Sequence, residues 1–344
     1  MSSRRNSIEK KSATGNRGAA YGPESGIVDF IQGITYEIWE QRQVENVLRY
    51  YADDVEVYSL DGITRSAASM VTNTHKTLAA YPDRLLIADD IICSGDAKKG
   101  FSSHRLLSPM SHLGDSELGP ASGRRVRIMN IADCQLNGGR ITREWLVRDN
   151  LALVQQLGFD PLNTAQSMAD RFDPELKEWL QQEFSRTSGS ESTGATLPGA
   201  DPIASLAHTV LDSCWKSGDS STLESSYAPY CVMHRAPTRI FSGREQILRH
   251  YAEWRKAFPE ASLRVDHICS QPFNGSLDSD CHNIALRWSV AATHEGSFAG
   301  CEPTGKPIYI LGVTHWKVVD GRITAEWTIF DELAMLAQTM STSA

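Results

Sequence analysis

The feature of this 344-residue sequence that most constrains its fold is an internal repeat. A series of residues in the first half returns in the second half at a constant offset of 182 positions, and upstream the offset relaxes to 176, which pairs Trp39 with Trp215. The repeated residues of the first series are Arg105, His112, Gly114, Gly123, Ile128, Gly139, Arg140, Ile141, Thr142, Glu144, Trp145, Asp149, Leu151, Ala152 and Gln156. A gap-free match of this length indicates a gene duplication, so one fold is expected twice.

The length fits two domains, because a single domain usually has about 100 to 200 residues around its own core. We expect the first domain over residues 27–160 and the second over residues 201–340. The connection, residues 161–200, begins with two short helical patterns. From Ser185 to Pro198 it is almost entirely Ser, Thr, Gly, Ala and Glu, which predicts a flexible linker.

Charge and cysteine usage exclude several classes of protein. The chain has 34 basic and 42 acidic residues, interspersed, and nucleic-acid binding would need a clustered basic face. Its 7 cysteines lie far apart without a C-x-x-C pair, as expected in a reducing compartment. No apolar run is long enough to span a bilayer. Residues 1–26 lack the apolar stretch of a secretory signal, so we expect a disordered tail on a cytoplasmic protein.

Each copy reads as helices followed by strands. Apolar residues recur at helical spacing from Ile27 to Ile38 and again from Ile203 to Cys214, so each copy opens with an amphipathic helix. In the second copy the pattern predicts a further helix near 244–257. It predicts strands at 262–270, 282–294, 307–319 and 322–330. This order indicates an α+β fold, with helices packed on one face of a curved, mainly antiparallel sheet.

The pair Asp320-Gly321 is the two-residue turn of a hairpin, which sets the expected register of the last two strands. Regular pairing from this turn opposes His315 to Glu326. It also puts Asp331 on the same apolar face as Trp327, beside Gly312.

The same logic in the first copy opposes Asp133 to Glu144. It places Asp149 on one face with Trp145, Val147 and Asn130.

Several stretches carry a family resemblance. They are Arg287-Trp288, Thr293-His294-Glu295-Gly296, Pro303-Thr304-Gly305-Lys306, Asp320-Gly321-Arg322-Ile323, and Glu326-Trp327 up to Asp331. Together they resemble the consensus of the SnoaL-like polyketide cyclase and ester cyclase family. The first copy is similar to a sister pattern that ends in Glu144-Trp145-Leu146-Val147-Arg148-Asp149-Asn150. Nearly all of both copies is covered.

The resemblance implies two tandem NTF2-like conical barrels, each with a deep apolar cavity. Members are usually dimeric through the outer sheet face, so the chain is expected to form a pseudo-dimer by itself, and further oligomerisation is left open. The family's cyclases use a cavity Asp as sole acid/base, without metal or cofactor. That Asp maps to Asp331, and in the first copy to Asp149.

The chemistry expected is an intramolecular aldol closure on a small hydrophobic, carbonyl-bearing molecule. One carboxyl group can remove a proton from carbon and return it to oxygen if burial raises its pKa. The side chains expected to bind the substrate are His234, Arg287, His294 and Trp327 in the second copy, and Tyr58, Arg105, His112, Trp145 and Asn130 in the first. Neither copy offers a metal-binding motif.

Structural alternatives stand beside these roles. Asp149 and Asp331 each lie where a strand gives way to a helix, and Asp is a favoured N-cap. His112 and His294 could serve to bridge a loop, the two Trp residues could belong to the core, and the two Arg residues could form buried ion pairs. A non-catalytic pseudo-dimer that binds a small molecule, or another NTF2-like lyase, isomerase or hydrolase, is the alternative function.

Overall fold

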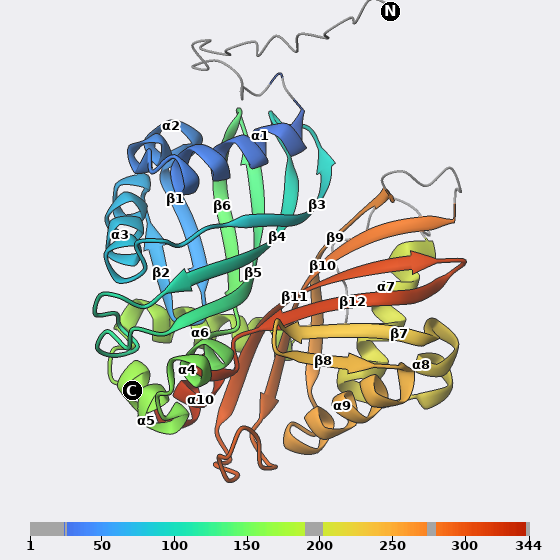
Figure 1. The fold of residues 1–344 in the computed structure, drawn as a ribbon. Helices are drawn as coiled ribbons and strands as arrows, with labels where there is room; N and C mark the ends of the chain where they lie inside the picture. Colours follow the sequence, from blue (N-terminus) through green and yellow to red (C-terminus); the bar gives the residue numbers. More distant parts are fainter. Residues whose placement is uncertain (1–23, 25, 190–201, 274–279, 342–344) are drawn as a thin grey trace, which may run out of the picture.

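The computed structural model describes residues 24, 26–189, 202–273 and 280–341. Residues 1–23, most of the expected tail, and 190–201, most of the expected linker, lie outside the described part. Within it the chain forms two domains of the same architecture, each a curved six-stranded sheet with helices over one face (Figure 1). Both sheets are open rather than closed barrels. The expected pair of α+β domains is confirmed.

The first sheet has the order β2-β1-β6-β5-β4-β3, and only β1 and β6 pair in parallel. Its strands are β1 (Tyr51–Ser59), β2 (Gly62–Arg65), β3 (Ile87–Gly95), β4 (Lys99–Ser111), β5 (Arg125–Asn137) and β6 (Arg140–Arg148). Its helices are α1 (Ile27–Thr35), which continues as a π-helical turn (Tyr36–Glu40), then a 3-10 turn (Val44–Asn46), α2 (Val47–Tyr50), α3 (Ala67–Ala80) and α4 (Asn150–Leu157). Helices α1 to α3 cover the concave face.

The second sheet repeats this order as β8-β7-β12-β11-β10-β9. Its strands are β7 (Tyr227–Ala236), β8 (Arg239–Ser242), β9 (Ser262–Pro272), β10 (Cys281–Thr293), β11 (Pro307–Val319) and β12 (Arg322–Phe330). Its helices are α7 (Pro202–Asp212) with a π-helical turn (Ser213–Ser217), α8 (Ser220–Ser226), α9 (Arg244–Ala257) and α10 (Glu332–Met340).

The connection begins with α5 (Pro161–Ala169) and α6 (Pro174–Ser188). Asp160 and Asp173 cap these two helices at their N-termini, each followed by a proline in the first turn. The predicted flexible linker was wrong at its start, because Ser185 to Ser188 form the last turn of α6. This helix packs against β9, β10 and β11 of the second domain.

One extra residue interrupts the last hairpin of each domain. Val319 opposes Arg322 as expected, but the register then shifts and Thr324 has no counterpart on β11. Thr142 does the same between β5 and β6. Each threonine hydroxyl donates back to a carbonyl on the facing strand, over 3.1 Å from Thr324 to Lys317 O and 3.3 Å from Thr142 to Gln135 O. Both are β-bulges, and a bulge changes which face the following residues occupy.

The bulges overturn the expected pairing. His315 opposes Trp327 rather than Glu326, and Asp133 opposes Trp145 rather than Glu144. Glu326 instead lies opposite Trp316, on the face covered by the helices. The expected face, with Trp327 and Asp331 beside Gly312, was therefore wrong beyond the bulge. Phe330, not Ile329, opposes Gly312.

The outer faces of the two sheets pack against each other by reciprocal contacts. The guanidinium carbon of Arg105 lies 3.8 Å from the ring centroid of Trp327, and that of Arg287 lies 3.4 Å from the centroid of Trp145. Because Arg287 and Trp327 are the repeat counterparts of Arg105 and Trp145, each domain gives the other the same pair. Such isologous contacts are the signature of two-fold packing, here within one chain.

A second reciprocal pair has diverged. Arg287 Nη1 donates to Asp133 Oδ2 over 2.5 Å, while Arg105 Nη1 lies 3.1 Å from Nδ1 of His315, the counterpart of Asp133. Nearby, Ser103 Oγ lies 2.8 Å from the other ring nitrogen of His315. The interface is thus polar and buried, with each guanidinium held between a ring and a hydrogen-bond partner.

The concave side of the second sheet is filled by aromatic side chains. Trp215, Trp288, Trp316 and Phe330 are each no more than 1% exposed and belong to one core cluster. A Cβ atom built on Gly312 would lie 2.2 Å from Cζ2 of Trp288, so the glycine makes room for the indole ring.

We predict that Gly312→Ala lowers the free energy of unfolding by about 1 to 3 kcal/mol, because the added methyl group overpacks the core against Trp288. Gly62→Ala is the matched control, since nothing lies within 4 Å of its built Cβ and its φ is not positive. Urea unfolding followed by tryptophan fluorescence measures both. Equal stability of the two variants would contradict the packing described.

Candidate functional site

The first domain keeps an open cavity where the second domain is filled. The cavity measures about 180 Å³ and lies between the concave sheet face and helices α1 and α3. Just under half of the residues that line it are aliphatic. Its polar and aromatic side chains include Thr35, Trp39, Tyr51, Thr64, Asn73, Thr74, Thr77, Arg84, His104, Asn130, Glu144 and Arg148.

Strand register arranges the polar wall in three rungs across β4, β5 and β6. The first rung is Ser102, Cys134 and Glu144, the second is His104, Ala132 and Leu146, and the third is Leu106, Asn130 and Arg148. Since alternate residues of a strand share a face, all three rungs lie on the concave face, and every member except Ser102 lines the cavity. The bulge at Thr142 puts Glu144 on this face.

Glu144 is the carboxyl group of the cavity. It is 6% exposed and accepts a hydrogen bond from Tyr51 Oη over 3.1 Å. Burial raises its pKa above the ordinary value, against the opposing effects of Tyr51, Arg148 and Cys134. A carboxyl group with a raised pKa holds a proton more readily than an exposed one, so it can donate a proton as well as accept one.

Two further polar groups in the wall lack partners. Asn130 is 2% exposed, and neither its amide nitrogen nor its oxygen has a hydrogen-bond partner in the described structure. Nε2 of His104, a side chain that is 3% exposed, is also without one. Burial lowers the pKa of His104 to about 4, so the ring is neutral at pH 7. Buried polar groups without partners are costly, which points to a ligand that supplies them.

The second domain has replaced this wall. At the repeat positions of His104, Leu106, Cys134 and Arg148 it carries Leu286, Trp288, Trp316 and Phe330. The carboxylate itself is retained as Glu326.

Glu326, however, is fully bonded. Tyr227, Tyr251 and Thr328 all donate hydroxyl hydrogen bonds to it, each over 2.5 Å. Because its oxygens already have donors and aromatic rings fill the space, Glu326 serves the core of the second domain.

Most of the side chains expected to bind substrate lie outside this cavity. Asn130 alone of them lines it. Those found on the outer sheet faces are Arg105, Trp145, Tyr58, Arg287, Trp327 and His234. Tyr58 stacks on Trp145 with centroids 6.1 Å apart, and His234 stacks on Trp327 at 5.3 Å, so they extend the interface.

His112 and His294 lie in the loops that follow β4 and β10. His112 stacks on Tyr81 with centroids 4.9 Å apart, and its ring nitrogens face the hydroxyls of Ser116 and Ser122. In the same loop, the backbone N–H of Gly114 donates to Ala80 O and so caps the end of α3. The repeated His-x-Gly stretch thus joins a loop to a helix end.

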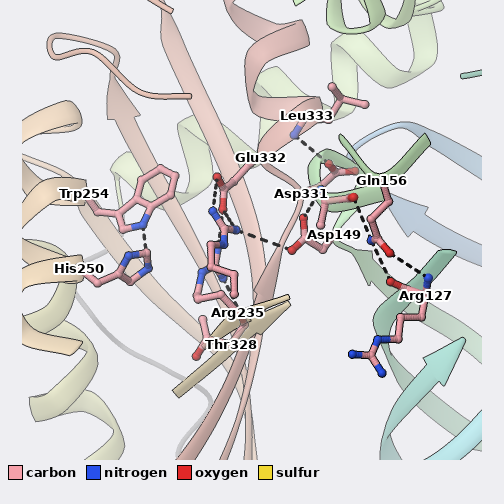
Figure 2. Close-up of polar contacts among 12 residues, drawn as sticks. Arg127, Asp149, Gln156, Arg235, His250, Trp254, Thr328, Asp331, Glu332 and Leu333 are labelled. Atoms are coloured by element: carbon pink, nitrogen blue, oxygen red, sulfur yellow. Dashed lines mark hydrogen bonds and ion pairs between the residues drawn. The ribbon is translucent and has the colours of Figure 1, made fainter. Parts of the chain in front are cut away.

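Asp149 and Asp331 meet at the junction of the two domains, where Figure 2 shows their surroundings. Each caps a helix: Asp149 accepts from Ala152 N, and Asp331 from Leu333 N and Ala334 N. Asp331 also accepts a hydrogen bond from Asn150 of the first domain over 2.5 Å. The N-cap alternative is therefore observed for both, and neither lines the cavity of the first domain.

Across the junction, Glu332 occupies the position equivalent to Asn150. It pairs with Arg235 over 2.7 Å and with Arg239, whose Nη2 also lies 3.7 Å from Asp149 (Figure 2). Burial, and next the charge of Glu332, raise the pKa of Asp149 to about 6. Burial and the nearby carboxylate of Asp61 raise that of Asp331.

Sequence reasoning missed Glu144, Tyr51, His104, Arg84 and Trp39 as cavity residues. Glu144 and Trp39 were visible as repeated residues, but regular pairing sent Glu144 to the wrong face. A signal for the bulge was present, since the repeat keeps a threonine two residues before each glutamate. His104 and Arg84 have no polar counterpart in the second copy, so the repeat could not mark them.

Among the described residues, histidine, cysteine and acidic side chains do not gather in groups of three or more that could hold a metal ion. Within the same part of the chain, no helix combines the length and apolar character needed to cross a bilayer.

Comparison with known proteins gives a family match over both copies. The pattern of the family described as SnoaL-like polyketide cyclase matches residues 30–157 and 205–339. No curated protein matches. Among solved structures, IdmH from Streptomyces antibioticus is 28% identical, with a TM-score of 0.33, over 40% of this chain and 97% of that one.

Two further solved structures are similar at lower identity. TsrD from Streptomyces laurentii is 20% identical, with a TM-score of 0.35, over 38% of this chain and 94% of its own. A SnoaL-like polyketide cyclase from Agrobacterium tumefaciens is 22% identical, with a TM-score of 0.33, over 38% and 97% respectively.

The junction carboxylates generate a prediction on pH. An unfolded Asp has a pKa near 3.9, so between about pH 4 and 6 folded Asp149 holds a proton that the unfolded chain has lost. Stability contributed by this group therefore falls as the pH rises through that window. Asp149→Asn should flatten the profile there by up to about 1.4 kcal/mol per pH unit, while Asn still caps α4.

Urea unfolding at half-unit steps from pH 4 to pH 7 measures this slope. Asp160→Asn is the control, because Asp160 caps α5 at an exposed position. A slope unchanged by Asp149→Asn would show that Asp149 does not titrate in this window.

Proposed function

This chain belongs to the SnoaL-like polyketide cyclase family, and on that premise we propose that it is a cofactor-independent acid/base enzyme of cyclase type whose working site is the cavity of the first domain. The observation that carries the proposal is Glu144, a buried carboxyl group of raised pKa in a cavity with an aliphatic part of its wall and with unpartnered polar groups in the rest. The substrate class is a small, largely apolar molecule with carbonyl groups.

The reaction we propose is an intramolecular aldol addition. Glu144 as carboxylate takes a proton from a carbon next to a carbonyl group, and the resulting enolate attacks a second carbonyl carbon of the same molecule. A carbon–carbon bond forms, and the alkoxide oxygen takes the proton back from Glu144. Atoms and electrons balance without an oxidant or a metal, so one carboxyl group suffices.

The unpartnered polar groups suit the charge that develops. An enolate oxygen needs hydrogen-bond donors, and the unpartnered amide of Asn130 in the third rung and a neutral imidazole N–H of His104 in the second can supply them. Tyr51 holds Glu144 by its hydroxyl hydrogen bond and so acts as a positioning residue. The aliphatic part of the wall packs on the apolar body of the substrate and folds it into a reactive conformer.

In this account the second domain is a scaffold. Its concave face is filled by aromatic side chains, and Glu326 is already fully hydrogen-bonded, so we place the reaction in the cavity of the first domain. The reciprocal contacts between the outer sheet faces hold the two domains together. The alternative hypothesis is that Asp331 or Asp149 is the acid/base. It predicts a different result in the exchange assay described next, so the same assay tests both.

We predict that the protein accelerates deuterium exchange at the α-carbon of methyl acetoacetate, followed by proton NMR in D₂O near neutral pH. Glu144→Gln should lower the enzyme-dependent rate about a hundredfold or more, because proton transfer is lost while the cavity keeps its shape. Asp331→Asn should leave the rate within about twofold, since Asn retains the helix cap.

Circular dichroism spectra and melting temperatures are the control that checks whether both variants fold. The opposite pattern, with Asp331→Asn inactive and Glu144→Gln active, would return the acid/base role to Asp331. Absence of exchange above buffer with the wild-type chain would favour the alternative, a binding module without turnover.

A further inference from the structure

The cavity of the first domain contains a guanidinium group that no acid neutralises. Arg84 is 9% exposed and lines the cavity. In the described structure its one hydrogen bond runs from Nε to Ser108 Oγ over 3.0 Å, and its terminal nitrogens have neither a hydrogen bond nor an ion pair. Its other polar contact is with the face of Trp39, 5.0 Å from the ring centroid.

The neighbours of Arg84 add positive charge rather than remove it. Arg148 and Arg42 both act on it electrostatically and, after burial, are among the causes that lower its pKa to about 9. Nη1 of Arg42 is itself buried without a partner, while Nη2 donates to Pro82 O. Among the described residues, Arg42 and Arg84 have no ion pair, and Arg148 pairs with the carboxylate of Asp61, which lies 3.4 Å from Arg148 Nη1. At neutral pH this end of the cavity is therefore cationic.

A buried, uncompensated guanidinium costs several kcal/mol of folding free energy. Its planar fork of donors matches a carboxylate, to which it can donate two parallel hydrogen bonds. We infer that the ligand of the first domain carries a carboxylate, bound by the free terminal nitrogens of Arg84, on a compact apolar body. The inference deepens the proposed function by naming the substrate class, but it requires binding at this cavity and not turnover.

The size and layout of the cavity refine the class. A cavity of about 150 Å³ accommodates a benzene ring, so about 180 Å³ suits a body of about one ring. Arg148 lies in the third rung and Glu144 in the first, four residues away on β6, or about 13 Å along the strand at about 3.3 Å per residue. The carboxylate thus binds on the Arg84 and Arg148 side of the cavity, and the reacting carbon lies toward Glu144.

The second domain is an internal comparison. The register of β9 on β10 gives Ala261 at the position of Arg84, and Phe330 replaces Arg148. Where the cavity has been filled, both cationic groups have been lost. The first copy therefore has both the open cavity and the two arginines, and the second copy has neither.

Isothermal titration with benzoate and with its neutral isostere benzamide, on the full chain in low-salt buffer at pH 7, tests the inference. We expect the wild type to bind benzoate at least tenfold more tightly than benzamide, with one site per chain. Arg84→Gln should weaken benzoate binding at least tenfold and leave benzamide binding unchanged. Arg171→Gln, which removes an exposed arginine in the turn after α5, is the matched control.

Benzamide binding as tight as benzoate in the wild type would overturn the inference, and this comparison needs no variant. Benzoate preference that survives Arg84→Gln would overturn the role of Arg84. The result is separable from the proposed function, because benzoate has no carbon acid to exchange. If the wild type exchanges deuterium but shows no preference for benzoate, only the proposed ligand class is refuted. If it prefers benzoate but does not exchange deuterium, only the proposed acid/base reaction is refuted.

Discussion

A single bulged threonine in the last hairpin of each domain decides which side chains meet a ligand and which meet the other domain. Thr142 and Thr324 each take up one residue without a partner and bond back to the facing strand. Beyond the bulge, Glu144 and Glu326 turn to the concave face, and the tryptophans that follow turn outward onto the arginines of the partner domain. Both the cavity carboxylate and the interface depend on this shift of one residue.

The interface and the cavity are two sides of the same strands. Arg105 lies on the outer face of β4 between the inward-facing residues His104 and Leu106, and Asp133 lies between Ala132 and Cys134 on β5. Packing Arg105 on Trp327 and Arg287 on Trp145 orders these strands from outside. Because the interface fixes these strands from the outer side, it also fixes the positions of the polar side chains that face the cavity.

The sequence predicted the fold closely because repetition, turn chemistry and helical periodicity are local signals. Arg244–Ala257, Pro307–Val319 and Arg322–Phe330 match the observed elements at both ends. The site was predicted less well, since face assignment requires an uninterrupted alternation that Thr142 and Thr324 break. Asn130 was named as a binding residue but on a face with Trp145 and Val147, whereas it lies opposite Arg148 on the cavity side. His104 and Arg84 are visible only once the filled and open copies are compared in space.

After the duplication, the first copy has an open cavity on its concave face, and aromatic side chains fill the same place in the second copy. Crystals pressurised with xenon test it directly, since xenon occupies apolar cavities and its anomalous signal locates it without any assumption on substrate. We expect xenon in the first domain, between α1 and the concave face of β5, and none among Trp215, Trp288 and Trp316. Xenon within the aromatic cluster of the second domain, or in that domain alone, would contradict it.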